Sequence, residues 1–149
     1  MRIALYHPEI AGNVGAILRL CACYEVPVDI IEPCGFAFSD KRLARAGMDY
    51  AAQAEVVRHA DWNAFQAQRT GRLVLMTTRG AQRLPDARFA ADDVLLMGSE
   101  GAGVPDDVHD SADVRIKIPL RTGFRSLNIG MAAGIALTEA LRQTGGLPE

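Results

Sequence analysis

The sequence lacks the features that mark secreted, membrane-spanning or zinc-stabilised proteins. Its three cysteines, Cys21, Cys23 and Cys34, form neither a CxxC pair nor a Cys/His ligand set, which predicts reduced thiols and no metal site. No apolar run approaches the roughly 20 residues that a membrane span requires. The N-terminal MRIALYHPEI has no signal-peptide pattern, because Pro8 and Glu9 follow a very short apolar stretch. We therefore expect a cytoplasmic protein that needs no membrane.

Common catalytic motifs are also missing. There is no GxxxxGK[ST], HExxH or GxSxG segment, and the three histidines show no ligand spacing. The loop from Gly98 to Gly103 has the order GxxGxG and is soon followed by Pro105, so it matches a dinucleotide fingerprint poorly. Glu100 would repel a phosphate held in this loop. A ligand that presents hydroxyl groups or positive charge suits the loop better.

The composition is that of an ordinary folded domain. The chain has 149 residues, 49% of them hydrophobic and 23% charged, with a formal net charge of −2. This charge argues against indiscriminate nucleic-acid binding but permits a local basic patch. Two basic clusters are present, although each taken alone is more typical of a solvated face: Lys41, Arg42 and Arg45, and Arg115, Lys117, Arg121 and Arg125.

Strand and helix patterns alternate along the chain. Apolar or alternating runs predict strands at 2–6, 27–31, 54–59, 72–77, 93–97 and 115–119, and helical patterns fall at 14–24, 41–46, 61–68, 106–110 and 129–141. Segment 79–92 is expected to be irregular. The order predicts an α/β fold with a mainly parallel sheet and helices on both faces. The loops after Met76, Met97 and Ile118 should then converge on one pocket at the carboxyl edge.

Polar residues just before the helical segments are candidates for N-caps. Asn13 precedes the first helix and Asp61 the third, and either Ser126 or Asn128 can cap the last helix. Ser126 as a nucleophile is disfavoured, since no His or Lys stands near it in sequence to activate it.

The last predicted helix is apolar on almost every side, which predicts burial on more than one face. Its small residues would let another backbone approach closely. Ordinary dense packing and a subunit interface explain that surface equally well. The small residues are Gly130, Ala132, Ala133, Gly134 and Ala136.

Arg19 lies off the apolar stripe of the first helix. Gly15 and Ala16, one turn earlier, are small enough for its side chain to lie over them toward the preceding loop. By itself the pattern favours an exposed, solubilising arginine.

Three ordered segments resemble the SPOUT class of RNA methyltransferases. They are Asn13-Val-Gly-Ala-Ile-Leu-Arg19, Leu95-Leu-Met-Gly-Ser-Glu-Gly-Ala-Gly103, and Ile118-Pro119 with Ser126-Leu-Asn128. The segments Ile31-Glu-Pro-Cys-Gly-Phe36 and Arg45-Ala-Gly-Met-Asp-Tyr50 resemble the small tRNA 2′-O-methyltransferases, which modify a pyrimidine at the anticodon wobble position. The likeness covers nearly the whole chain.

The resemblance implies one SPOUT domain over residues 1–149, with a trefoil knot at about 72–143, that forms a homodimer. It implies transfer of a methyl group from S-adenosylmethionine to the ribose 2′-hydroxyl of the wobble cytidine or uridine in the tRNA anticodon stem-loop. The residues matched to cofactor binding are Met76, Thr77, Gly98, Glu100, Gly101, Ile118, Leu120, Ser126 and Leu127.

The resemblance also implies a catalytic centre and an RNA-binding surface. The centre comprises Asn13, Arg19, Glu100, Ser126 and Asn128. A guanidinium is almost never deprotonated in a protein, so we expect Arg19 to hold the adjacent phosphate and stabilise charge on the reacting oxygen. The candidates for binding the anticodon stem are Lys41, Arg42, Arg45, Arg121 and Arg125.

One position departs from the family pattern. Many close relatives carry Tyr immediately before the Glu of the last helix, where this chain has Thr138 before Glu139. Any aromatic contact made by that tyrosine is absent here, which leaves the preference between cytidine and uridine open.

Three alternatives remain. A catalytically silent RNA-binding dimer is opposed by the presence of Arg19, Ser126 and Asn128. A nucleotide-binding enzyme that uses the glycine loop for phosphate is opposed by Glu100. A ribosomal RNA 2′-O-methyltransferase is disfavoured because we expect no added RNA-binding domain.

Overall fold

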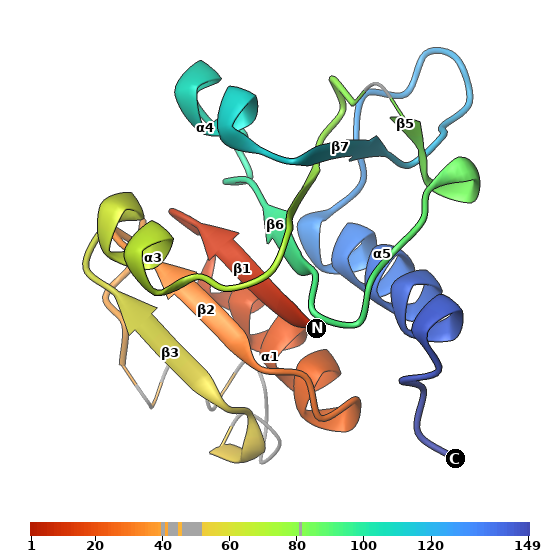
Figure 1. Cartoon of the computed structure of the whole chain (residues 1–149). Coiled ribbons are helices and arrows are strands. Elements are labelled where there is room, and N and C mark those ends of the chain that lie inside the picture. Colours follow the sequence, from red (N-terminus) through yellow and green to blue (C-terminus); the bar gives the residue numbers. More distant parts are fainter. Residues whose placement is uncertain (40, 42–44, 46–51, 81) are drawn as a thin grey trace.

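A computed structural model describes residues 1–39, 41, 45, 52–80 and 82–149. Its sheet has the strand order β3-β2-β1-β6-β4-β7-β5 (Figure 1). Every neighbouring pair of these strands is parallel. The strands are β1 (Arg2–Tyr6), β2 (Val28–Ile31), β3 (Val56–His59), β4 (Leu73–Met76), β5 (Gln82–Arg83), β6 (Val94–Met97) and β7 (Val114–Lys117).

Helices cover both faces of this sheet. On one face α1 (Ala11–Cys23) and α5 (Ile129–Thr144) enclose the larger core, and on the other α3 (Trp62–Gln68) and α4 (Asp106–Ser111) enclose the smaller one. The strands supply both cores by alternation, since Ile3 and Leu5 face the first while Ala4 and Tyr6 face the second. The predicted α/β class with a parallel sheet is confirmed.

The predicted capping residues have mixed outcomes. Asp61 caps α3 by accepting from the backbone N–H of Ala64 at 2.7 Å. Asn128, rather than Ser126, caps α5 by accepting from Gly130 N at 2.8 Å and Met131 N at 3.3 Å. The prediction that Asn13 caps α1 is wrong, because the helix begins at Ala11 and Ile10 is its N-cap.

Two other sequence predictions differ from the structure. Segment 79–92 is less irregular than expected, since it includes the short strand β5 and a 3₁₀ helix at Leu84–Asp86. The predicted helix at 41–46 lies mostly outside the described residues, although Lys41 and Arg45 are helical.

Helix α5 is buried on only one of its faces within the single chain, so the prediction of burial on more than one face is wrong. Ala133, Ala136 and Leu137 are fully buried, whereas Met131 is 63% exposed and Ile135 41% exposed. The small residues serve packing against α1 on the covered side, where a Cβ added at Gly130 would lie 3.8 Å from the Ala16 Cβ. A separate apolar strip of α5 remains uncovered within this chain.

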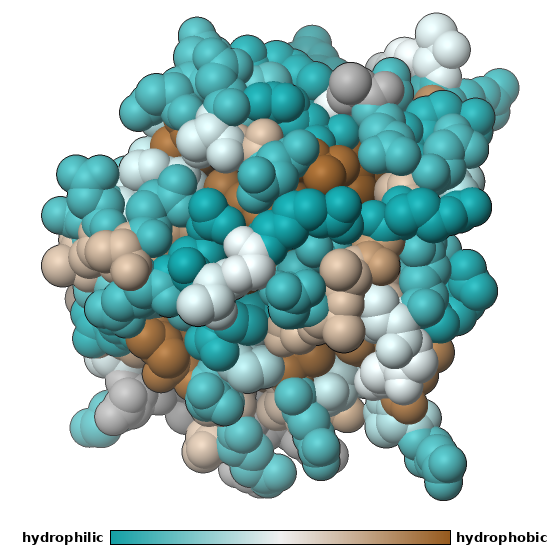
Figure 2. All heavy atoms as spheres, in the orientation of Figure 1, coloured by the Kyte–Doolittle hydropathy of each residue, from teal (hydrophilic) through white to brown (hydrophobic). Residues whose placement is uncertain are grey.

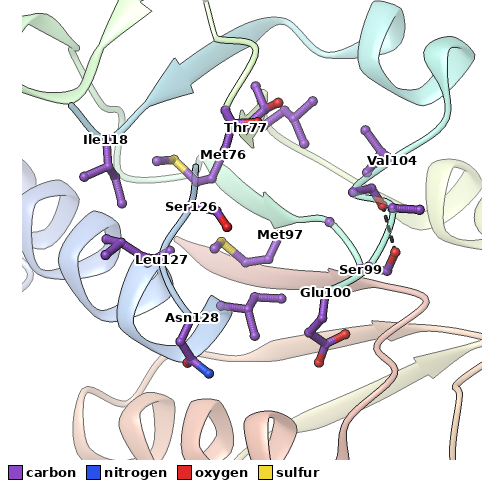
Figure 3. Close-up of a pocket in the computed structure, with 18 of the residues that line it drawn as sticks. Met76, Thr77, Met97, Ser99, Glu100, Val104, Ile118, Ser126, Leu127 and Asn128 are labelled. Atoms are coloured by element: carbon purple, nitrogen blue, oxygen red, sulfur yellow. Dashed lines mark hydrogen bonds between the residues drawn. The ribbon is translucent and has the colours of Figure 1, made fainter. Parts of the chain in front are cut away.

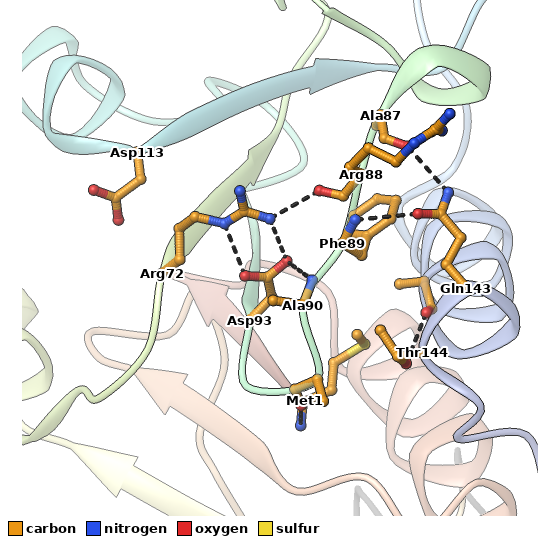
Figure 4. Close-up of polar contacts among 12 residues, drawn as sticks. Met1, Arg72, Ala87, Arg88, Phe89, Ala90, Asp93, Asp113, Gln143 and Thr144 are labelled. Carbon is orange, nitrogen blue, oxygen red and sulfur yellow. Dashed lines mark hydrogen bonds and ion pairs between the residues drawn. The ribbon is translucent and has the colours of Figure 1, made fainter.

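An ion pair ties the amino ends of β4 and β6 together (Figure 4). The Arg72 guanidinium donates to both carboxylate oxygens of the fully buried Asp93, each at 2.9 Å. Asp93 also accepts from Ala90 N at 2.8 Å. Gln143 of α5 bonds to the Ala87 carbonyl and the Phe89 N–H, both at 3.1 Å. These contacts fix the edge of the sheet opposite the carboxyl ends of the strands.

The face of the molecule seen in Figure 2 is largely hydrophilic, with small apolar areas between polar side chains. Within the described part of the chain, no helix combines the length and the apolar character needed to cross a bilayer.

Candidate active site

A cavity of about 600 Å³ lies where β4, β6 and β7 end (Figure 3). The three loops predicted to converge all line it: 77–79 after β4, 98–104 after β6, and residues between 118 and 129 after β7. Every residue matched to cofactor binding is part of the lining. The carboxyl edge of a parallel sheet is the usual place for a ligand, and the volume suits a small molecule.

The walls of the cavity suit a nucleoside better than a polyphosphate. Met76, Met97, Ile118 and Leu127 contribute apolar surface, with Thr77 and Ser126 among the polar groups (Figure 3). Of the described lining residues only Arg79 is basic, and its guanidinium lies 3.2 Å from the Asp106 carboxylate. A flat base, a ribose and a sulfonium therefore match this lining, as the methyl donor predicted from the resemblance requires.

The glycine loop after β6 is a narrow hairpin rather than a phosphate cradle. Ser99 N donates to Gly103 O at 2.9 Å and Gly103 N donates back to Ser99 O at 3.0 Å, so these two N–H groups are already used. Ser99 Oγ adds a bond of 3.1 Å to Gly103 O (Figure 3). A Cβ at Gly98 would lie 2.8 Å from the Gly103 backbone, so only glycine fits there. Two N–H groups of the loop are therefore unavailable to a phosphate, which further weakens the dinucleotide interpretation.

Glu100 connects this hairpin to the start of α1. Its carboxylate accepts from Glu9 N at 2.8 Å, Ile10 N at 3.2 Å and Asn13 Nδ2 at 3.2 Å. The backbone donors at a helix start need partners, and here a distant loop supplies one. Glu100 is therefore a positioning residue in this structure.

The two asparagines extend the same network to α5. Asn128 Nδ2 donates to Asn13 Oδ1 at 3.0 Å, while Asn128 Oδ1 caps α5. Asn13, Glu100, Ser126 and Asn128, four of the predicted catalytic residues, all line the cavity.

The remaining predicted site residues lie outside the lining. Arg19 projects from the exposed side of α1. Lys41, Arg45, Arg121 and Arg125 are exposed, and Arg42 lies outside the described residues. Arg115, from the second basic cluster, donates to the carbonyl oxygens of His109 and Asp110. Arg115 therefore stabilises the C-terminal end of α4 by hydrogen bonding to its carbonyl groups.

Several lining residues escaped the sequence analysis. Met97 and Arg79 adjoin predicted loops, so proximity was a usable signal. The sequence around Ile10 gave no signal, because Ile10 reaches the cavity only through the early start of α1. Thr138, which departs from the family pattern, lies outside this cavity, and its Oγ1 is 3.4 Å from the hydroxyl of Tyr24, the C-cap of α1. In the described ranges we find no group of three His, Cys, Asp or Glu arranged to hold a metal.

Comparison with known proteins gives consistent matches. Residues 1–138 match the SpoU rRNA Methylase family. The tRNA (cytidine(34)-2′-O)-methyltransferase of Beijerinckia indica subsp. indica is 53% identical over 97% of this chain and 92% of its own length. A structure solved to explain the 2-OH methylation of C/U34 on tRNA has a TM-score of 0.90 and 38% identity, covering 95% of this chain and 94% of its own.

A longer relative shares the fold with a bound methyl donor. The AdoMet-bound rRNA methyltransferase of Sinorhizobium meliloti has a TM-score of 0.85 at 27% identity, and the match covers 95% of this chain but 55% of that one. The family match over most of the chain, together with the converging loops, leads to one conclusion: this chain belongs to the SpoU rRNA methylase family.

Proposed function

We propose that this protein transfers the methyl group of S-adenosylmethionine to the ribose 2′-hydroxyl of the wobble pyrimidine in a tRNA anticodon loop. The observation that carries the proposal is the convergence of the three loops with Asn13, Glu100, Ser126 and Asn128 around one cavity. The relatives named for methylation of cytidine 34 support the same substrate.

The cofactor supplies an electrophilic methyl group on a sulfonium. In our proposal the apolar side chains of Met76, Ile118, Leu120 and Leu127 pack on its nucleoside, while backbone groups of the Gly98–Gly101 turn and the Ser126 hydroxyl bind its polar atoms. Glu100 keeps that turn in place through α1. When the cofactor is bound, the fixed dipoles of these groups would help to hold it in position for methyl transfer.

Arg19 is proposed to act on the RNA side of the reaction. A guanidinium cannot serve as a base at neutral pH. It can hold the phosphate next to the target ribose and stabilise negative charge on the 2′-oxygen as the methyl group transfers. Arg19 lies on the exposed side of α1.

The anticodon stem is proposed to bind two groups of basic residues. Arg121 and Arg125 lie in the loop after β7, which also lines the cavity, and Phe124 between them is 71% exposed. Lys41, Arg42 and Arg45 are the second group. Phosphate contacts of this kind position an RNA without reading its bases.

A homodimer is proposed through the uncovered strip of α5. Met131 and Ile135 are large, apolar and exposed, and they border a surface hollow of about 810 Å³ with Leu20 and Leu84. A contiguous exposed apolar patch favours a protein interface. A second copy of this strip is a self-complementary partner. We place the dimer in the cytoplasm, where its tRNA substrate is found.

A trefoil knot within one domain, at about residues 72–143, also remains a proposal. It is supported by the convergence of the loops after β4, β6 and β7, which the resemblance assigns to the knot, around one cavity.

Methyl transfer from labelled S-adenosylmethionine to bulk tRNA lacking wobble methylation tests the proposal. Nuclease digestion should recover the label in a 2′-O-methylpyrimidine nucleoside, and the label should disappear with Arg19→Ala. Cofactor binding without transfer to tRNA but with transfer to ribosomal RNA would favour the ribosomal alternative. RNA binding without cofactor binding would favour a silent RNA-binding dimer.

A further inference from the structure

A second cavity of about 480 Å³ lies on the other side of the glycine hairpin. It shares Ser99, Ala102, Gly103 and Val104 with the cavity at the ends of β4, β6 and β7, called the donor cavity from here on, so a strip of the hairpin separates the two. Loops after β1 and β2 form its far wall, through residues 6–9 and 33–35. A ligand in this second cavity would lie beside a ligand in the first.

One wall of this cavity is an aromatic stack. The Tyr6 and His7 rings are 3.9 Å apart between centroids and tilted by only 19°. Tyr6 is buried, and its ring contacts the Trp62 ring edge-on, with 5.8 Å between the centroids. These contacts fix the Tyr6 ring of the stack. His7 has φ of 43°, an unusual value for a residue with a side chain. The backbone turn after β1 thus brings a half-buried imidazole onto the Tyr6 ring.

The imidazole is suited to stacking in its neutral form. Burial lowers the pKa of His7, so the uncharged ring predominates at pH 7. Burial likewise raises the pKa of Cys34, which keeps a neutral thiol on the opposite loop. Flipped-out RNA bases commonly stack on Tyr, Phe, Trp or His rings.

A carboxylate stands at the edge of the same cavity. The backbone of Glu9 packs on Gly35, where an added Cβ would lie 2.8 Å from Glu9 Cα. Its carboxylate oxygens lie 3.1 and 3.3 Å from the Cβ position of Gly101, at the tip of the hairpin. Within residues 1–39, 41, 45, 52–80 and 82–149, no hydrogen bond or ion pair engages this carboxylate. Glu9 is an exposed residue in the lining of this cavity, and its carboxylate is available to accept a hydrogen bond from a ligand.

We propose that this second cavity receives the base of the nucleotide whose ribose is methylated, stacked on His7, with Glu9 accepting a hydrogen bond from the exocyclic amine of cytosine. The proposal rests on the proposed function and adds the residues that select the base. Carboxylates recognise cytosine through its N4 amino group. Uracil presents a carbonyl oxygen at that position, which a carboxylate repels. The cavity therefore selects cytidine over uridine.

The proposal requires the nucleotide to cross the hairpin, with its base in the second cavity and its ribose at the donor cavity, and the hairpin leaves room for this. Gly101 and Gly103 carry no side chains, and the Cβ position at Gly103 meets no atom within 4 Å. A ribose can cross the hairpin there, with its base against His7 and its 2′-hydroxyl toward the donor cavity.

The test compares kcat/KM on two unmodified anticodon stem-loops that differ only in C or U at the wobble position. The variants are Glu9→Gln, His7→Ala and His7→Phe, and Glu55→Gln is the matched control because it neutralises an exposed carboxylate at the amino end of β3. Affinity for S-adenosylmethionine is measured in parallel by calorimetry as a check on folding and on the donor cavity.

The wild-type protein should prefer the C substrate, and Glu9→Gln should reduce the C-to-U ratio by about tenfold, since a glutamine amide can also donate to uracil. His7→Ala should lower kcat/KM on both substrates by roughly tenfold through lost stacking, whereas His7→Phe should preserve it. Cofactor affinity should stay unchanged throughout.

An unchanged C-to-U ratio in Glu9→Gln, with an active wild type, would overturn the base-selection cavity and leave the methyltransferase function standing. Equal losses in His7→Ala and His7→Phe would overturn the stacking role. A wild type that binds the cofactor but methylates neither stem-loop would overturn both this inference and the proposed substrate.

Discussion

Asn128 donates from Nδ2 to Asn13 Oδ1 at 3.0 Å, joining the cap of the last helix to the first turn of the first helix. The same Asn13 donates to Glu100 at 3.2 Å. Three segments that are far apart in sequence thus meet through amide and carboxylate groups at one wall of the donor cavity. Short polar side chains hold this wall, so changes of single atoms in it should be measurable.

Asn128→Ala should lower the free energy of unfolding by about 1 kcal/mol, because α5 loses its N-cap. Asn128→Asp keeps the cap acceptor but has no amide to donate to Asn13. In a double-mutant cycle with Asn13→Ala, urea denaturation at fixed protein concentration should give a coupling energy of about 0.5–1 kcal/mol. Strictly additive effects would show that the hydrogen bond between the Asn128 and Asn13 side chains contributes nothing to stability in solution.

Gly98→Ala should weaken binding of S-adenosylmethionine and destabilise the protein by at least about 1 kcal/mol, because its Cβ would lie 2.8 Å from the Gly103 backbone. Gly12→Ala is the matched control, since a Cβ there meets no atom within 4 Å and alanine favours the helix. Calorimetric titration measures the cofactor affinity of each variant, and thermal denaturation measures its stability. Equal behaviour of the two variants would mean that the hairpin adapts to a side chain.

Arg19→Ala should reduce the single-turnover methylation rate by about 100-fold or more, as loss of a preorganised charge donor does. Arg19→Lys keeps the charge but not the forked donor geometry, so it should recover only a small part of that loss. Cofactor affinity should match the wild type in both. A lysine variant that retains most of the rate would count against a bidentate contact.

Ile135→Glu should convert the protein to a monomer in sedimentation equilibrium, because it places a charge in the apolar strip of α5. Leu147→Glu is the control, since Leu147 is 40% exposed, close to the 41% of Ile135, but lies beyond the end of the helix. If both variants sediment as the wild type does, the dimer uses another surface.

Cys21 and Cys23 should differ in reactivity although both belong to α1. Burial raises the pKa of Cys21 from 9.0 to about 12, whereas Cys23 is exposed. In the folded protein at pH 9, iodoacetamide should modify Cys23 rapidly and Cys21 only after urea is added.

The same shift predicts the direction of a pH effect on stability. The pKa of Cys21 is higher in the folded protein than in the unfolded chain, so the buried neutral thiol contributes fully to the free energy of unfolding below about pH 9. This contribution is lost as the pH rises toward 12. Unfolding curves of the wild type and Cys21→Ala should therefore converge in free energy over this range.

Local patterns in the sequence predict most of the fold. Alternation and apolar runs identify the central strands, and Asp61 marks the start of α3 because its cap is local. The start of α1 could not be predicted in this way, since the partner of its N–H groups is Glu100 and no pattern near residue 10 reveals it. The exposed strip of α5 escaped prediction because Met131 and Ile135 are as apolar as the residues that face the core.

The site was predictable to a similar degree. Strand ends alone indicate which loops converge, and the family resemblance adds the individual residues within them. Neither source indicates the cavity behind the hairpin, because it depends on φ at His7 and on the Tyr6 stack, which are properties of the folded chain.

The contact between Glu100 and the backbone of Glu9 spans 91 positions of the chain. During synthesis from the N-terminus, helix α1 leaves the ribosome long before the carboxylate that completes its first turn. The backbone N–H groups of Glu9 and Ile10, which lead into this helix, therefore gain their Glu100 partner only after the sixth strand and its hairpin have been made.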